Sequence, residues 1–256
     1  MAGPRRWVVR LAQVVALGAA LAASLGAWRV MTDDTRGRGP EPKDPYAAER
    51  KSMVFTQLER RGIRSGAVLR AMEKVPRHRF VPENLAQLAY EDGPLPIGYG
   101  QTISQPYIVA LMTEALEITP RDRVLEVGTG SGYQTAVLAE LAQEVYTIEI
   151  VEPLGRGAEA RLRELGCSNV HVRIGDGYQG WTEHAPYDAI IVTAAPEHVP
   201  EPLLAQLKIG GRLVIPLGRQ EQDLVLLRKT KDGVKRRTLS PVRFVPMTGE
   251  AGETVH

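Results

Sequence analysis

Two carboxylates in this sequence lie close to the ends of apolar segments, and a glycine-rich turn separates them. Glu126 lies in Val124–Gly132, which reads Val-Leu-Glu-Val-Gly-Thr-Gly-Ser-Gly, and Glu149 ends the apolar run Val145–Glu149. An apolar strand, a glycine turn, a helix and a second strand that ends in an acid are typical of a nucleotide-binding βαβ unit. In such a unit the second acid, Glu149, is placed to accept hydrogen bonds from both hydroxyls of a ribose.

The spacing of the glycines narrows the choice of nucleotide. A dinucleotide fingerprint, G-x-G-x-x-G, needs a third glycine where this sequence has Tyr133. A Walker loop needs Gly-Lys-Ser/Thr, and no lysine lies in or near this turn. With dinucleotides and phosphate-bearing nucleotides disfavoured, the expected ligand has a ribose and no phosphate. S-adenosylmethionine (SAM) fits, because its cationic sulfonium tolerates a nearby carboxylate such as Glu126. The turn residues that we expect to bind SAM are Gly128, Thr129, Gly130 and Gly132.

Charge and cysteine content exclude several classes of protein. Residues 1–48 carry seven Lys/Arg and four Asp/Glu, which leaves 25 Lys/Arg against 26 Asp/Glu in residues 49–256. A nearly neutral body lacks the basic surface of a nucleic-acid binder. The single cysteine, Cys167, excludes an internal disulfide and a multi-cysteine zinc site, and the five scattered histidines have no metal-ligand spacing. We therefore expect no metal cofactor and no nucleic-acid partner.

The elements that must position the turn follow an alternating order. Residues 121–256 alternate between strands and helices, which predicts an α/β domain with a doubly wound, mostly parallel sheet. The predicted strands are Val124–Val127, Val145–Glu149, Val170–Ile174, Ala189–Thr193 and Arg212–Pro216, extended by Asp223–Leu227 and Val242–Pro246, and the predicted helices are Tyr133–Leu141, Pro153–Leu165 and Pro200–Leu207.

A region of helices and loops, residues 47–120, is predicted to precede the sheet. One helix is expected over Ala48–Arg61, and a second begins after Ser65, which can cap it. Residues 94–105 are expected to form a loop, after which Pro106 opens the next helix.

The amino-terminal part of the sequence differs from the rest. Leu11–Trp28 contains no charged residue and arginines flank it, so residues 1–31 are expected to be a signal-like or membrane-anchor segment. Residues 32–46, rich in proline, glycine and charge, are predicted to be a flexible linker. Because SAM is made in the cytosol, we expect a cytoplasmic catalytic domain that residues 11–28 attach to a membrane, with export to the periplasm as the alternative.

One segment of the sequence is more specific than the glycine turn. Gly100–Tyr107 reads Gly-Gln-Thr-Ile-Ser-Gln-Pro-Tyr, and further segments follow it in a fixed order. Together they resemble the protein-L-isoaspartate O-methyltransferase family from Lys51 to Met247, whereas the strands and the glycine turn alone resemble SAM methyltransferases in general. The further segments are Gly132–Ala139, Gly175–Gly177, Pro186–Val192, Gly210–Val214 and Phe244–Pro246.

The resemblance implies a Rossmann-like SAM-methyltransferase fold and a protein-repair activity. The methyl group of SAM would pass to the α-carboxylate of L-isoaspartyl residues, and of D-aspartyl residues as a second class, in damaged proteins and peptides. The ester would then close to a succinimide and reopen in part as normal aspartate. We also expect the enzyme to act as a monomer.

The resemblance places Ser104 at the reaction centre, with Thr102 and Ile103 lining the same pocket. A serine hydroxyl can donate to the substrate α-carboxylate and turn one oxygen toward the methyl carbon. The carboxylate has a pKa near ~3.5 and is already ionised at neutral pH, so no general base is required. The alternative is that Ser104 only caps the helix opened by Pro106.

The resemblance also implies roles on the SAM side of the pocket. Asp176, with Gly177, would meet the adenine amino group, although an aspartate between two glycines is equally a turn residue. Glu126 would reach the methionine end of SAM, directly or through water, or hold the amides of the glycine turn.

Three other functions are consistent with parts of the sequence. Amino-methylating nucleic-acid enzymes carry an Asn/Asp-Pro-Pro-aromatic tetrapeptide after the fourth strand, but this position reads Thr193-Ala194-Ala195-Pro196. A small-molecule methyltransferase would share only the SAM half. A membrane-tethered SAM-binding module without catalysis is disfavoured by the intact Ser104 and turn glycines.

Overall fold

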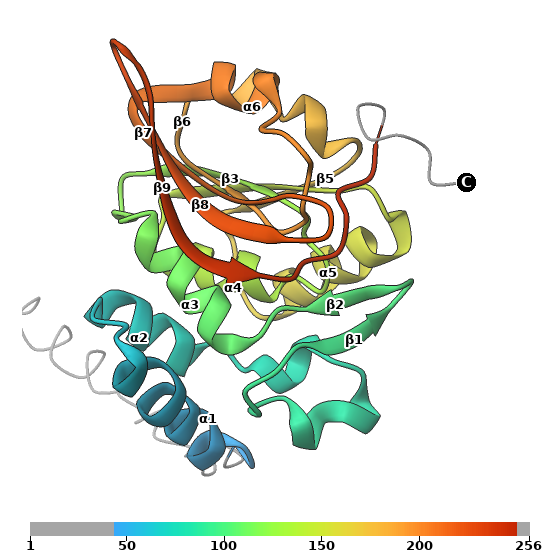
Figure 1. Cartoon of the computed structure of the whole chain (residues 1–256). Helices are drawn as coiled ribbons and strands as arrows, with labels where there is room; N and C mark the ends of the chain where they lie inside the picture. Colours follow the sequence, from blue (N-terminus) through green and yellow to red (C-terminus); the bar gives the residue numbers. More distant parts are fainter. Residues whose placement is uncertain (1–43, 250–256) are drawn as a thin grey trace, which may run out of the picture. The chain divides into compact units, whose positions relative to one another are not determined.

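The computed structural model describes residues 44–249, and the folded unit begins at Pro45 (Figure 1). The predictions for the apolar segment, residues 1–31, and for most of the linker lie outside the described residues. Within residues 44–249, no helix combines the length and the apolar character needed to cross a membrane.

A mostly parallel sheet is the centre of this unit, as the sequence predicted. Its strands are β3 (Arg123–Val127), β4 (Glu144–Glu149), β5 (Val170–Ile174), β6 (Tyr187–Val192), β7 (Leu207–Leu217), β8 (Gln222–Thr230) and β9 (Gly233–Val242). They lie in the order β5-β4-β3-β6-β7-β8-β9. The pairs from β5 to β7 are parallel, whereas β8 is antiparallel to both β7 and β9.

Helices cover both faces of the sheet. The α-helices are α1 (Ala47–Met53), α2 (Gly66–Lys74), α3 (Pro106–Ala115), α4 (Tyr133–Ala139), α5 (Glu152–Glu164) and α6 (Glu201–Gln206), with a π-helix η1 (Val54–Leu58) and 3₁₀ helices η2 (Glu59–Arg61), η3 (Arg77–Phe80), η4 (Glu83–Leu88), η5 (Gly177–Gln179) and η6 (Thr182–His184). Helices α3, α4 and α5 lie on one face and α6 on the other (Figure 1). Successive residues of a strand point to opposite faces, so Val124 packs against the α3 and α4 side while Leu125 packs against the α6 side.

The order of the strands places a crevice beside β3. After β3 the chain moves outward through β4 and β5, and then returns to form β6 on the opposite side of β3. Such a reversal leaves a crevice at the carboxyl ends of the strands, where ligands of open α/β sheets bind. The glycine turn follows β3 directly and therefore lies at this crevice.

A hairpin replaces the loop that we predicted for residues 94–105. Strand β1 (Leu95–Gly98) pairs with β2 (Gln101–Ile103) in antiparallel register, with Leu95 opposite Ile103. Glycines and a proline break the apolar alternation that would reveal strands in the sequence. The tip residue Tyr99 has φ 53°.

The prediction of a last strand at Val242–Pro246 is wrong. The last strand, β9, ends at Val242, and Pro246 forms only an isolated bridge with Ala195. Strand β9 is the edge of the sheet and exposes most of its residues, so it lacks the apolar alternation on which the prediction depended.

The folded unit also includes the end of the predicted linker. The ring of Tyr46 lies 4.6 Å from that of His78 and 6.0 Å from that of Tyr90, between ring centroids. Tyr46 also precedes α1 and accepts a hydrogen bond from the Arg50 amide. The boundary between linker and domain therefore lies before Tyr46.

Candidate active site

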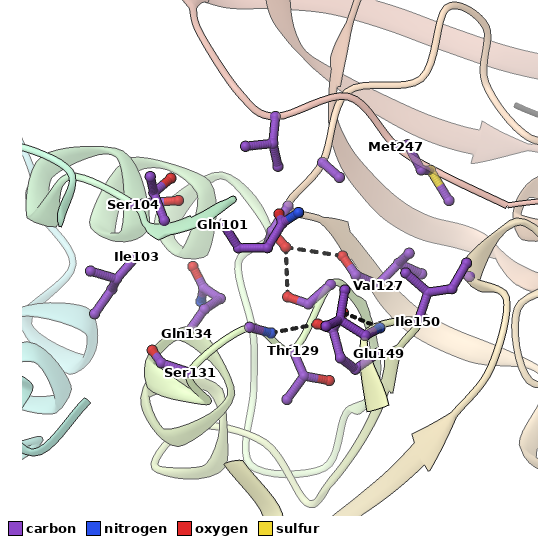
Figure 2. A pocket seen from close by; sticks show the side chains of 18 of the residues that line it. Gln101, Ile103, Ser104, Val127, Thr129, Ser131, Gln134, Glu149, Ile150 and Met247 are labelled. Atoms are coloured by element: carbon purple, nitrogen blue, oxygen red, sulfur yellow. Dashed lines mark hydrogen bonds between the residues drawn. The ribbon is translucent and has the colours of Figure 1, made fainter. Parts of the chain in front are cut away.

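A cavity of about 830 Å³, including the solvent at its mouth, opens at the carboxyl ends of β3 and β4. Strand β2 and Ser104 border one side of it, and the glycine turn borders the other (Figure 2). Eight of the predicted site residues line this cavity: Thr102, Ile103, Ser104, Gly128, Thr129, Gly130, Glu149 and Gly177. The hairpin thus brings the substrate-side segment against the SAM-side turn.

The glycine turn requires its glycines for reasons of backbone shape and close packing. Gly128 has φ 96°, a conformation that residues with a side chain rarely adopt. A Cβ at Gly128 would also lie 2.3 Å from Thr193 Oγ1. That hydroxyl lies 2.6 Å from Gly128 O and 3.1 Å from Val127 O and shares its one proton between them, which joins the turn to the end of β6.

Glu149 holds the turn from the pocket side. Its Oε2 accepts a hydrogen bond from Gly130 N at 2.7 Å, and its Oε1 accepts one from Val151 N at 2.9 Å (Figure 2). Only 6% of Glu149 is exposed. Among the described residues that line the cavity, it is the one that carries a formal charge.

Ser104 faces the cavity without a role in the following helix. Its hydroxyl forms no hydrogen bond with any of residues 44–249, and helix α3 begins at Pro106 after Gln105, which makes no side-chain cap. The capping alternative therefore has no support in the geometry, and the Ser104 hydroxyl remains available to a ligand.

Three predicted residues do not line the cavity. Asp176 precedes η5 and accepts a hydrogen bond from Tyr178 N at 2.9 Å, which holds it in the turn beside Gly177. Gly132 precedes α4 and faces α5, where a Cβ would lie 3.2 Å from Leu162 Cδ1. The third residue is Glu126.

Glu126 lies behind the turn, and the expected contact with the methionine end has no geometric support. It is fully buried, and its Oε2 accepts hydrogen bonds from Thr135 Oγ1 at 2.5 Å and Thr147 Oγ1 at 2.7 Å. Burial raises the pKa of Glu126 to about 8, and the charge of Glu149 acts in the same direction, although the two hydroxyl donors oppose the shift. The role that we proposed for Glu126, holding a turn amide, is performed by Glu149.

Other lining residues were missed by the sequence prediction. Gln134, in the first turn of α4, is 8% exposed and donates to Thr113 Oγ1 at 2.9 Å. The position of Gln134, directly after Gly132 and Tyr133, is the feature of the sequence from which it could have been predicted. The Val245–Thr248 segment also lines the cavity, because Ala195 N donates to Val245 O at 2.8 Å and Met247 N donates to Ala195 O at 2.9 Å. This pairing links positions far apart in the chain and has no local signal.

The lining suits a cationic nucleoside better than a phosphate. A phosphate site needs cationic side chains or a ring of amides, and no lysine or arginine among residues 44–249 lines this cavity. The cavity offers a single acid, a glycine turn and an available hydroxyl. These groups fit a ligand that has a ribose and a positive charge, next to a second molecule that has a carboxylate.

Comparison with known proteins agrees with this geometry. A model of the family "Protein-L-isoaspartate(D-aspartate) O-methyltransferase (PCMT)" matches residues 49–252. A protein-L-isoaspartate O-methyltransferase of Picosynechococcus sp. is 59% identical over 208 residues, which cover 81% of this chain and 94% of the relative. One from Gloeobacter violaceus is 60% identical and covers 77% of this chain and 98% of the relative.

Solved structures give the same result. A structure of a protein-L-isoaspartate O-methyltransferase matches with TM-score 0.72 and 31% identity, covering 79% of this chain and 67% of that one. A Plasmodium falciparum protein described as a putative member, in complex with S-adenosyl-L-homocysteine (SAH), matches with TM-score 0.68 and 29% identity, covering 78% and 98%. With the family match over most of its length, the chain belongs to the protein-L-isoaspartate(D-aspartate) O-methyltransferase family.

Proposed function

We propose that this protein transfers a methyl group from SAM to the α-carboxylate of L-isoaspartyl residues in damaged proteins, with Ser104 orienting that carboxylate. Membership of the family supports the activity and the cosubstrate. The observation that carries the roles of the residues is that Ser104 and the glycine turn line one cavity. The family description supports D-aspartyl residues as a second class of substrate.

The SAM side of the cavity is assigned to the turn and to Glu149. A carboxylate oxygen has two acceptor positions, and one position on each oxygen of Glu149 is used by a backbone amide. The remaining positions can accept from the two hydroxyls of a ribose. Thr129, Gly130 and Gly177 border the same space, and Asp176, next to Gly177, is assigned to the adenine amino group. When bound, SAM supplies an electrophilic methyl group on a cationic sulfur.

The substrate side is assigned to the segment around Ser104. The serine hydroxyl donates to one oxygen of the α-carboxylate, which leaves the other oxygen free to face the methyl group. Thr102 and Ile103 border the space in which the isoaspartyl residue would lie. Because the carboxylate is ionised at neutral pH, this site contributes orientation and exclusion of water instead of proton transfer.

A methyl-transfer assay with paired peptides tests the proposal. Labelled SAM is offered with an isoaspartyl peptide and with the aspartyl peptide of the same sequence. We expect methylation of the isoaspartyl peptide alone, and the label should be lost in mild base as expected for an ester. Equal labelling of both peptides, or labelling of an added nucleic acid instead, would overturn the assignment.

The compartment and the assembly are part of the proposal. The methyl donor is made in the cytosol, so we propose that the catalytic domain faces the cytosol and that residues 11–28 attach it to a membrane. We also propose that it acts as a monomer.

A further inference from the structure

A path of hydrogen bonds runs beneath the glycine turn, on the side away from the cavity. Thr129 Oγ1, in the turn, lies 2.6 Å from Thr147 Oγ1 on β4. Thr147 Oγ1 lies 2.7 Å from Oε2 of Glu126 on β3, and Thr135 Oγ1 of α4 also donates to that oxygen. Thr135, Thr147 and Glu126 are fully buried, and Thr129 is 3% exposed. No solvent competes for these bonds.

We propose that Glu126 is a positioning residue that holds the glycine turn in its SAM-binding geometry through Thr147 and Thr129. The inference rests on the proposed function, because it takes the cavity as the SAM site. Glu126 itself does not border the cavity. It acts on the ligand only through the residues that it holds.

The direction of the bonds supports this role. A hydroxyl has one proton to donate. Since Thr147 donates its proton to Glu126, the bond between the two threonines must take its proton from Thr129. The Thr129 side chain is then fixed as a donor toward β4, and in Figure 2 it points away from Gln101 and Ser104.

The turn needs such an anchor because its glycines are flexible. Gly128 and Gly130 flank Thr129 and have φ 96° and 54°. Glycine restricts the backbone less than any other residue, so the turn depends on its hydrogen bonds for a single shape. Glu149 holds Gly130 from the cavity side, and the threonine path holds Thr129 from the sheet side.

The second oxygen of Glu126 fits a neutral carboxylic acid. Its Oε1 has no hydrogen-bond partner among the described residues. In the sheet, Glu126 pairs with Thr147 on β4 and with Ile191 on β6, and the charged group that acts on it is Glu149. No cation compensates a negative charge there within the described unit, so a neutral acceptor is the form that suits the site. A glutamine would offer the same acceptor.

Two threonines provide a matched comparison for the experiment. Thr147→Val and Thr135→Val each remove one hydroxyl that donates to Glu126, but only the first breaks the path to Thr129. SAH binding is measured by titration calorimetry and stability by thermal melting. We expect Thr147→Val to weaken SAH binding roughly five- to fifteen-fold, the effect of losing one or two buried hydrogen bonds. Thr135→Val, with a similar loss of stability, should bind SAH within about two-fold of wild type.

Conservative variants separate positioning from general destabilisation. Thr147→Ser keeps the hydroxyl and Glu126→Gln keeps the acceptor, so both should bind SAH nearly as the wild type does, whereas Glu126→Met should resemble Thr147→Val. Equal SAH affinities of the Thr147→Val and Thr135→Val proteins would overturn the inference. Absence of SAH binding by the wild-type protein would instead overturn the proposed function, and this inference with it.

Discussion

The two acids of the βαβ unit show how the surroundings of a residue decide its role. The sequence predicted a ligand contact for Glu149, and for Glu126 either a ligand contact or a role in holding the amides of the glycine turn. In the structure Glu149 receives two backbone amides at the cavity wall, whereas Glu126 receives two hydroxyls in the interior. The spacing of the motif identifies both residues, but their roles follow from their positions along the strands. Glu126 lies inside β3, where Thr135 of α4 contacts it, whereas Glu149 is the last residue of β4 and reaches the cavity.

Replacing Ser104 by alanine should slow methyl transfer without weakening SAM binding. Loss of one orienting hydrogen bond, at roughly 1–3 kcal/mol, predicts about a five- to hundred-fold lower single-turnover rate on an isoaspartyl peptide. The melting temperature should remain unchanged, because the hydroxyl makes no hydrogen bond to the described residues. An unchanged rate would remove Ser104 from the reaction centre.

Replacing Glu149 by alanine should weaken SAM binding sharply in a folded protein. The change removes the ribose acceptors and also releases Gly130 N. Hydrogen bonds to a charged acceptor contribute roughly 1.5–3 kcal/mol each, so the Kd should rise by more than about ten-fold. Glu152→Ala is the control, since within residues 44–249 that exposed acid pairs only with Arg156, on the surface of α5. Calorimetry that gives a wild-type Kd for the folded Glu149 variant would refute the ribose assignment.

Replacing Glu126 by glutamine should change how stability depends on pH. The pKa of Glu126 rises from 4.5 to about 8 on folding, mainly through burial. Between these values the folded state holds a proton that the unfolded state has released, so this group lowers stability as pH rises. The slope of one such proton is at most roughly 1.4 kcal/mol per pH unit. In urea unfolding at several pH values, the free energy of unfolding of the variant should rise relative to that of the wild type from pH ~5 to ~8. If the difference between the two free energies stays constant over this range, Glu126 is not neutral in the folded protein.

At the scale of elements, the apolar patterns revealed the strands that are buried on both faces and also β5, which is partly exposed. Strands β3, β4 and β6 are almost entirely buried, and their continuous apolar runs predicted them closely. The β1–β2 hairpin and β9 escaped prediction because one is interrupted by glycine and proline and the other is an exposed edge. Such segments form strands because neighbouring strands pair with them, and their own sequences carry no apolar pattern that would predict it.

Arg212 connects two elements, and its loss should destabilise the fold. Its guanidinium donates to Leu116 O at 2.6 Å, Glu117 O at 3.2 Å and Asp122 Oδ2 at 2.7 Å, which joins the end of α3 to β7. The side chain is only 14% exposed. Arg212→Met should lower the free energy of unfolding by about 2–4 kcal/mol, because it leaves these acceptors without a hydrogen-bond donor.

A surface arginine provides the control for this prediction. Arg156 pairs with Glu152 one helical turn away, and its side chain is 68% exposed. Arg156→Met should change the free energy of unfolding by less than about 0.5 kcal/mol. If urea unfolding gives similar changes in the free energy of unfolding for the two substitutions, the contacts of Arg212 between α3 and β7 do not stabilise the fold.

At the scale of the whole molecule, the cavity draws on segments from Gln101 to Thr248. The order of the motifs in the sequence identified most of these segments. It could not show that the residues after β9 return to pair with Ala195, since that contact depends on the assembled sheet. Composition and motifs therefore predicted the class of ligand, but they did not predict every residue that lines the cavity.

The position of Tyr46 gives a test of the domain boundary. A protein that begins at Asp44 keeps the contacts of Tyr46 with His78 and Tyr90 and should bind SAM and methylate an isoaspartyl peptide. Aromatic pairs contribute about 0.5–1.5 kcal/mol each, so a protein that begins at Ala47 should melt several degrees lower. Equal melting temperatures would place Tyr46 outside the folded unit, and loss of SAM binding by the longer protein would show that residues 1–43 belong to it.

The polarity that concealed β9 in the sequence also protects the folded protein from aggregation. An edge strand presents unpaired amides and carbonyls that can recruit a strand from another molecule. Strand β9 places three consecutive exposed cations, Lys235, Arg236 and Arg237, along this edge. Two copies that met edge to edge would bring these charges together, and their repulsion would oppose fibre-like growth.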